Sequence, residues 1–171
     1  RTRLSGTSAV VTVHTGVNDP VRGTLTYGDE QYEERGKHGN LEFCLPKAVL
    51  WSAEHPVLYG LKLELLTEDG RAADAVSLKI GLRQVEMIPG KGMYVNGSRV
   101  ILKGVCLHQD AGCCGIAVRK EIWKERLLDL KEMGCNAIRA AHHLHSEEFL
   151  DLCDELGFYV YEECFDKWTS G

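Results

Sequence analysis

Residues 136–161, NAIRAAHHLHSEEFLDLCDELGFYVY, contain the pattern that decides the fold of the second half of the chain. Asn136–Ala140 is short and mostly apolar and predicts a strand. Ser146 is a good helix N-cap and two glutamates follow it, so a helix is expected to begin there and to end at Gly157. Phe158–Tyr161 is a continuous apolar run, which is typical of a parallel strand buried on both faces.

A similar pattern precedes this segment. Val100–Val105 predicts a strand, and Glu121–Met133 carries apolar residues at helical spacing with Gly134 at its end. The order strand–helix–strand–helix–strand requires right-handed crossovers and a parallel sheet. Three strands fit either an open sheet or the first part of a (β/α)8 barrel, which needs eight strands and about 250 residues.

The first half of the chain predicts short antiparallel strands. Alternating or β-branched stretches occur at Ala9–Val13, Leu25–Tyr27, Leu41–Leu45, Leu61–Leu65 and Val76–Ile80. Turn residues separate them, which predicts an immunoglobulin-like β-sandwich that lacks the Cys–Trp–Cys framework of antibody domains. The expected class is therefore a multidomain protein, β followed by α/β. We expect the immunoglobulin-like β-sandwich at residues 1–86 and the N-terminal part of a TIM barrel at residues 87–171.

Composition limits the class of protein. The 171 residues are 44% hydrophobic and 26% charged, and the net charge is −5, as in ordinary soluble domains. No apolar run approaches the ~18 residues of a membrane span, and no basic patch suggests a nucleic-acid partner. Seven irregularly spaced cysteines argue against disulfides and indicate a reducing compartment, here the bacterial cytoplasm. The chain begins without Met or a signal peptide, so a fragment is expected.

Polar side chains gather after each of the three strands of the second half. They are His108 and Asp110 after the first, Arg139, His142 and His143 at the second, and Glu162, Glu163, Asp166 and Trp168 at the third. Because the carboxyl ends of parallel strands meet at one rim, these residues are expected to surround one pocket. Carboxylates accept hydrogen bonds from paired hydroxyls and an indole covers a sugar's C–H face, which favours a polyhydroxylated ligand. Arg139 is expected to pair with Glu163 or Glu162.

Several blocks of sequence occur in a characteristic order. They are Trp51-Ser52 with His55-Pro56 and Leu58-Tyr59, Gly81–Arg83, Tyr94–Gly97, Leu102–Val105, His108–Asp110, Asn136–Arg139, Cys153–Gly157 and Glu162–Asp166. In this order they strongly resemble family 2 of the glycoside hydrolases, which contains β-galactosidases, β-glucuronidases and β-mannosidases. The resemblance implies a retaining β-glycosidase, in which one glutamate is the general acid/base and another the nucleophile. It also implies that both glutamates lie beyond Gly171, so the chain is expected to be inactive alone.

The resemblance assigns a substrate-pocket role to seven residues. They are His108, Asp110, Arg139, His142, Glu163, Asp166 and Trp168, with Glu163 holding Arg139 in place. The chain departs from the family at Cys106, where Asn is usual, and in the segment after His142. It also departs at Lys167, which replaces the acidic residue that binds magnesium in some β-galactosidases. No metal and no cofactor is therefore predicted, and the expected substrate is a β-glycoside of unspecified sugar.

Two other functions stay open. His108, Asp110, His142 and a later carboxylate fit a metal-dependent hydrolase on a parallel barrel, although His-x-His on the first strand would be expected there. The second alternative is a non-catalytic carbohydrate-binding or scaffold module. Whatever the function, the first and third strands of the second half are expected to be open edges of a partial barrel, which predicts self-association of the chain.

Overall fold

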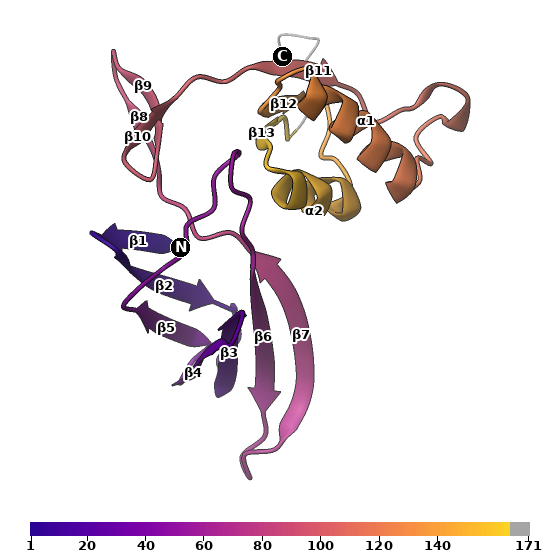
Figure 1. Cartoon of the computed structure of the whole chain (residues 1–171). Helices are drawn as coiled ribbons and strands as arrows, with labels where there is room; N and C mark the ends of the chain where they lie inside the picture. Colours follow the sequence, from indigo (N-terminus) through magenta and orange to yellow (C-terminus); the bar gives the residue numbers. More distant parts are fainter. Residues whose placement is uncertain (165–171) are drawn as a thin grey trace, which may run out of the picture. The chain divides into compact units, whose positions relative to one another are not determined.

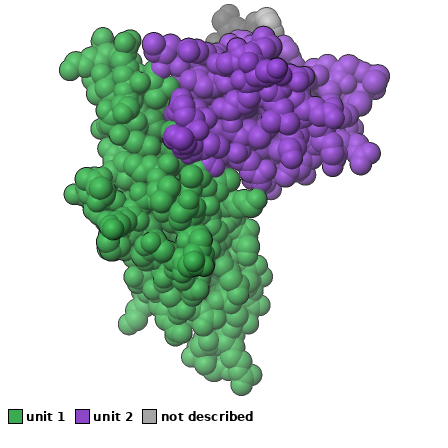
Figure 2. Space-filling model, viewed as in Figure 1, with its two compact units in different colours: residues 1–52, 57–100 green, residues 53–56, 101–171 purple. Residues whose placement is uncertain are grey.

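The computed structural model describes residues 1–164 and divides the chain into two compact units, which Figure 2 colours separately. Unit 1 comprises residues 1–52 and 57–100, and unit 2 comprises residues 53–56 and residues from 101 onward. The domain boundary predicted between residues 86 and 87 stays a prediction. Within the described residues, no helix is both long and apolar enough to cross a membrane.

Two antiparallel sheets form the β-sandwich of unit 1 (Figure 1). One sheet has the order β1-β2-β5, with bounds Thr2–Ser5, Ser8–His14 and Asn40–Leu45. The other has the order β4-β3-β6-β7, with bounds Glu30–Gly36, Val21–Tyr27, Tyr59–Leu66 and Ala72–Ile80. Val11 and Phe43 from the first sheet pack with Leu25 and Leu61 from the second, and all four are buried. This two-layer core confirms the predicted sandwich.

Strand β7 differs from the prediction in its burial. Val76 and Leu78 alternate with polar residues, which predicts one buried face, yet they are 49% and 47% exposed. The reason is position, because β7 lies at the edge of a four-stranded sheet that faces a three-stranded one. Strand β4 was not predicted, since EQYEERG contains only one large apolar side chain, that of Tyr32.

A small antiparallel sheet completes unit 1. Its order is β10-β9-β8, with bounds Ser98–Val100, Gly92–Val95 and Val85–Ile88. Asn96, in the turn after β9, donates from Nδ2 to the carbonyl oxygen of Trp51 at 3.1 Å. The Trp51 ring is fully buried, with the Arg83 guanidinium 4.4 Å from its centroid. The segment that carries Trp51 is thus fixed within unit 1.

Unit 2 has the predicted β-α-β-α-β order. Its parallel sheet, β11-β12-β13, has the bounds Gly104–Leu107, Ala137–Ala140 and Tyr159–Glu162. A 3-10 helix, Gly112–Cys114, and the helix α1, Lys120–Glu132, follow β11, and α2, Glu147–Leu156, follows β12 (Figure 1). Trp123 and Leu127 of α1 and Phe149 and Leu152 of α2 form one buried cluster with Ile138 of β12.

Both helices end at a glycine in the left-handed conformation. Gly134 follows the C-cap of α1 with φ +87°, and Gly157 is the C-cap of α2 with φ +79°. The N-terminus of α2 is capped as predicted, because the Ser146 hydroxyl accepts from the amide of Phe149 at 3.3 Å. The sequence signals at Ser146 and Gly157 therefore predicted both ends of α2 correctly.

Residues 53–56 pack with unit 2, although they lie between two stretches of unit 1 in the chain. The Lys131 ammonium of α1 donates to the carbonyl oxygens of Ala53 at 2.9 Å and of Gly157 at 2.7 Å. It also lies 4.8 Å from the centroid of the Phe158 ring. Burial lowers the pKa of Lys131. One cation thus joins residue 53 to the end of α2.

The first strand of unit 2 begins later than predicted. The prediction was Val100–Val105, but β11 begins at Gly104. Asn136 explains the shift, because its Oδ1 accepts from the amide of Lys103 at 2.7 Å and its Nδ2 donates to the carbonyl of Ile101 at 3.0 Å. The Lys103 carbonyl also accepts from the backbone amides of Asn136 at 2.8 Å and Ala137 at 3.2 Å, but the regular pairing of β11 with β12 begins only at Gly104.

Tyr161 corrects the prediction that Phe158–Tyr161 is buried on both faces. Phe158 and Tyr159 are buried, but Tyr161 is 66% exposed. Side chains alternate between the two faces of a strand. Val160 packs into the cluster with the helices, so Tyr161 lies on the opposite face, which no element of unit 2 covers among the described residues.

Candidate active site

The site lies on the helix-free face and at the carboxyl ends of the parallel strands. Register pairs Cys106 of β11 with Arg139 of β12, and Arg139 with Tyr161 of β13. All three are exposed, whereas their neighbours Val105 and Ile138 contribute to the core with the helices. Residues 106, 139 and 161 thus lie side by side across the three strands, and the Arg139 guanidinium lies beside the residues that follow β13.

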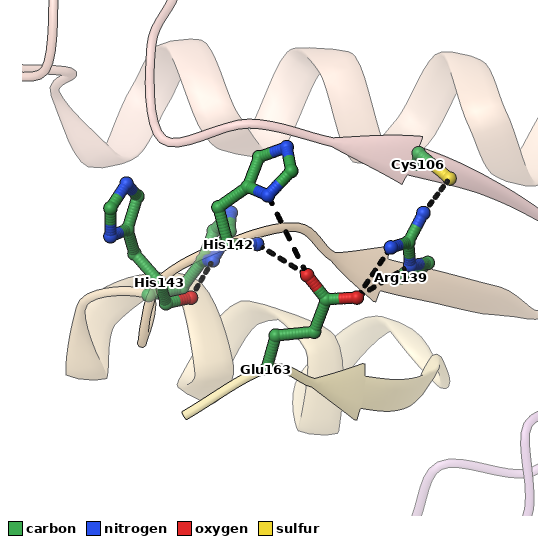
Figure 3. Close-up of polar contacts among 6 residues, drawn as sticks. Cys106, Arg139, His142, His143 and Glu163 are labelled. Carbon is green, nitrogen blue, oxygen red and sulfur yellow. Dashed lines mark hydrogen bonds and ion pairs between the residues drawn. The ribbon is translucent and has the colours of Figure 1, made fainter. Parts of the chain in front are cut away.

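The Glu163 carboxylate is the centre of the site (Figure 3). Its Oε1 accepts from Arg139 Nε at 2.8 Å and from Nη2 at 2.5 Å, and its Oε2 accepts from the amide of His142 at 2.6 Å. The amide of His142 and the guanidinium of Arg139 hold the pKa of Glu163 below its usual value. The ion pair predicted for Arg139 is therefore confirmed, with Glu163 as its partner.

His142 adopts an unusual backbone conformation. Its φ is +73°, a left-handed region that costs about 1–2 kcal/mol for a residue with a Cβ. The hydrogen bond to Glu163 Oε2 accompanies this conformation, and His142 Nδ1 lies 3.9 Å from the same oxygen. The ring centroid of His108 is 5.0 Å from that of His142. Four of the predicted site residues, His108, Arg139, His142 and Glu163, thus form one connected group.

The remaining predicted residues lie elsewhere or outside the description. Within residues 1–164, the Asp110 side chain has no hydrogen bond or ion pair to this group, and its carbonyl accepts from Arg126 at 3.2 Å. Asp166 and Trp168 lie outside the described residues. Glu162 is not the partner of Arg139, since its carboxylate accepts from the amide of His145 at 2.8 Å.

Cys106 contacts the site in a way that the sequence did not reveal. Its Sγ lies 3.6 Å from Arg139 Nη1, on the other side of the guanidinium from Glu163 (Figure 3). Hydrogen bonds to Cys106 and to Glu163 raise the pKa of Arg139. Only the strand register, which pairs residues 106 and 139, would have pointed to this contact.

The group leaves hydrogen-bond donors of Arg139 open to solvent. Arg139 has a 48% exposed side chain and Glu163 a 21% exposed one, so the guanidinium is available to hydroxyls or to a carboxylate. Among residues 1–164, no three His, Cys, Asp or Glu side chains gather closely enough to hold a metal ion.

Comparison with known families decides the relationship of the chain. The family model "Glycosyl hydrolases family 2" matches residues 1–83, and "Glycosyl hydrolases family 2, TIM barrel domain" matches residues 86–168. The chain belongs to glycosyl hydrolase family 2. For this family 2 chain the predicted resemblance is confirmed, as is the predicted class, an immunoglobulin-like sandwich followed by the start of a TIM barrel.

Similar proteins are named as β-glycosidases. The β-galactosidase BoGH2A of Bacteroides ovatus is 40% identical over 121 residues, which are 71% of this family 2 chain and 14% of that protein. A β-glycosidase crystal structure from Bacteroides vulgatus has a TM-score of 0.84 at 34% identity, covering 98% of this chain and 23% of that one. A β-glucuronidase from Ruminococcus gnavus in complex with D-glucuronic acid has a TM-score of 0.84 at 31% identity. The match covers 95% of this chain and 28% of that one. The chain thus spans less than a third of each relative.

Proposed function

We propose that this chain is part of a β-glycosidase that removes terminal β-linked sugars with retention of configuration. The names of its relatives support the substrate class, a β-glycoside. In a double displacement, one glutamate attacks the anomeric carbon and a second protonates the leaving oxygen, then activates water. We assign both of these glutamates to barrel strands other than β11, β12 and β13. The role of the present chain is to bind the sugar.

The observation that carries this proposal is the linked group of Arg139, Glu163 and His142. Glu163 uses both oxygens to hold the guanidinium and the His142 amide. It is therefore a scaffold for its neighbours and is not free to act as a nucleophile or acid. Arg139 is left to organise carboxylates and hydroxyls at the rim, with His108 beside His142. Asp110, Asp166 and Trp168 complete the proposed sugar pocket.

The test is the substitution Arg139→Ala in the full-length enzyme. Loss of a charged hydrogen-bond donor is expected to lower kcat/KM roughly tenfold to a hundredfold. Arg35→Ala is the matched control, because Arg35 forms a looser exposed pair with Glu33, at 3.8 Å, on unit 1. A change of less than about twofold for Arg139→Ala would reduce Arg139 to a solvated surface charge.

A second measurement tests the division of labour. The 171-residue chain alone is expected not to cleave nitrophenyl β-glycosides, because the reacting glutamates are assigned elsewhere. Turnover well above background that disappears in Glu163→Gln would overturn the scaffold role of Glu163.

We also propose that the parent enzyme lies in the bacterial cytoplasm, because its cysteines are irregularly spaced. We further propose that the immunoglobulin-like domain comprises residues 1–86 and that the barrel begins at residue 87.

A further inference from the structure

Glu163 holds the Arg139 guanidinium through only one of its carboxylate oxygens. Arg139 Nε and Nη2 both donate to the same oxygen, Oε1, while Oε2 is engaged by the amide of His142. A guanidinium held by both carboxylate oxygens is fixed in its plane by two parallel hydrogen bonds. Here both bonds converge on a single atom, so the guanidinium retains freedom to pivot about Oε1.

The Cys106 side chain lies where it would restrict this rotation of the Arg139 guanidinium. Its Sγ is 3.6 Å from Nη1, the nitrogen that Glu163 does not contact (Figure 3). The strand register holds it there, because residues 106 and 139 are paired in neighbouring parallel strands and both side chains lie on the helix-free face. The contact thus depends on two rigid strands, and sulfur is a weak hydrogen-bond acceptor that can take an N–H.

We propose that Cys106 is a positioning residue for Arg139, a role that rests on the proposed function. Glu163 holds one edge of the guanidinium and the Cys106 sulfur holds Nη1, so the plane of the group is fixed. A guanidinium has five N–H donors, and these contacts engage three of them. The other two are then presented in a set direction towards the substrate or a catalytic carboxylate.

The enzymatic test compares three substitutions at residue 106 in the full-length enzyme. Cys106→Ala removes the acceptor and is expected to lower kcat/KM roughly threefold to tenfold, the effect of one weak hydrogen bond. Cys106→Asn supplies an amide oxygen with similar reach and is expected to restore most of the loss. Cys106→Ser has a shorter bond to its oxygen and is expected to restore less. Cys44→Ala, at an exposed cysteine of β5, is the control.

A double mutant of residues 106 and 139 distinguishes a positioning role of Cys106 from a general effect on the structure. In an Arg139→Ala background, Cys106→Ala is expected to cause no further loss, because the group that it positions is already absent. Additive losses, or equal activity of the Ala and Asn variants at residue 106, would overturn the proposal. A parent enzyme inactive on every β-glycoside would instead overturn the proposed function.

A spectroscopic measurement on the 171-residue chain keeps these two failures apart. Rotation of the Arg139 guanidinium can be followed by 15N–1H NMR of labelled arginine. Separate Nη signals at low temperature are expected for the unaltered chain and for Cys106→Asn, and averaged signals for Cys106→Ala. Identical Arg139 spectra in all three chains would refute the positioning role, whatever the enzyme does.

Discussion

Two glycines offer a measurement of how residues 53–56 are held in unit 2. Gly157 and Gly134 both end a helix of unit 2 in the left-handed conformation, at φ +79° and +87°. A Cβ at Gly134 would meet no atom within 4 Å, whereas a Cβ at Gly157 would lie 2.3 Å from the carbonyl oxygen of Ala53. Alanine at either position has the same backbone cost, and only at Gly157 must the segment also move.

The expected costs follow from these contacts. A left-handed Ala costs about 1–2 kcal/mol, which is the whole effect expected for Gly134→Ala. Gly157→Ala pushes the Ala53 carbonyl away and weakens its hydrogen bond from Lys131, which adds about 1 kcal/mol for one net hydrogen bond. The free energy of unfolding of unit 2 is therefore expected to fall further in Gly157→Ala than in Gly134→Ala.

Circular dichroism at 222 nm during urea unfolding is a suitable assay, because α1 and α2 both belong to unit 2. Hydrogen exchange of residues 53–56 locates the effect, and faster exchange is expected in Gly157→Ala only. Equal losses of stability in the two variants, with unchanged exchange at residues 53–56, would refute the reasoning. This result would mean that residues 53–56 move away from residue 157 without lowering the free energy of unfolding of unit 2.

The remaining predictions concern pH, thiol chemistry and assembly. Hydrogen bonds from Arg22 and Lys62 lower the pKa of Glu64 to about 2, so its contribution to the stability of unit 1 is present above about pH 4.5. This contribution is lost as the pH falls towards 2, and acid unfolding of Glu64→Gln is expected to lack that component. Burial raises the pKa of Cys153 to about 12, so iodoacetamide at pH 8 is expected to label Cys153 only after unfolding, as mass spectrometry can determine. Light scattering over a dilution series is expected to detect self-association, because β11 and β13 are open edges of their sheet among the described residues; a strictly monomeric chain would contradict this.

Helix α2 and the sandwich could be predicted because their signals are local. Ser146 and Gly157 mark the ends of α2 through their own hydrogen bonding and backbone conformation. The start of β11 could not be predicted, because it depends on the Asn136 side chain, more than thirty residues away. The burial of β7 and of Tyr161 also depends on what lies across from them, which alternation alone does not specify.

The ion pair of Arg139 could be predicted from the sequence, whereas the other contacts of Arg139 and of the glutamates could not. An arginine and a carboxylate at adjacent strand ends indicated an ion pair, and Arg139 is indeed paired with Glu163. The choice of Glu163 over Glu162 required the register of β13, since Glu162 bonds to the amide of His145. The Cys106 contact required the same kind of information from β11. Sequence thus predicted that Arg139 pairs with a glutamate, but it did not identify which glutamate or the contact with Cys106.

The left-handed backbone of His142 has a consequence for the order of folding. Before Glu163 arrives, its hydrogen bond to the His142 amide is missing, and the left-handed conformation costs about 1–2 kcal/mol, so the loop after β12 is expected to sample ordinary backbone regions more often. Glu163 lies 21 residues further along the chain, and it is synthesised after the whole of α2. On the ribosome, both helices of unit 2 can therefore form before the loop after β12 adopts its final conformation. The loop at His142 is expected to be set by the arrival of β13, so the proposed sugar-binding surface is expected to be among the last parts of this unit to take shape.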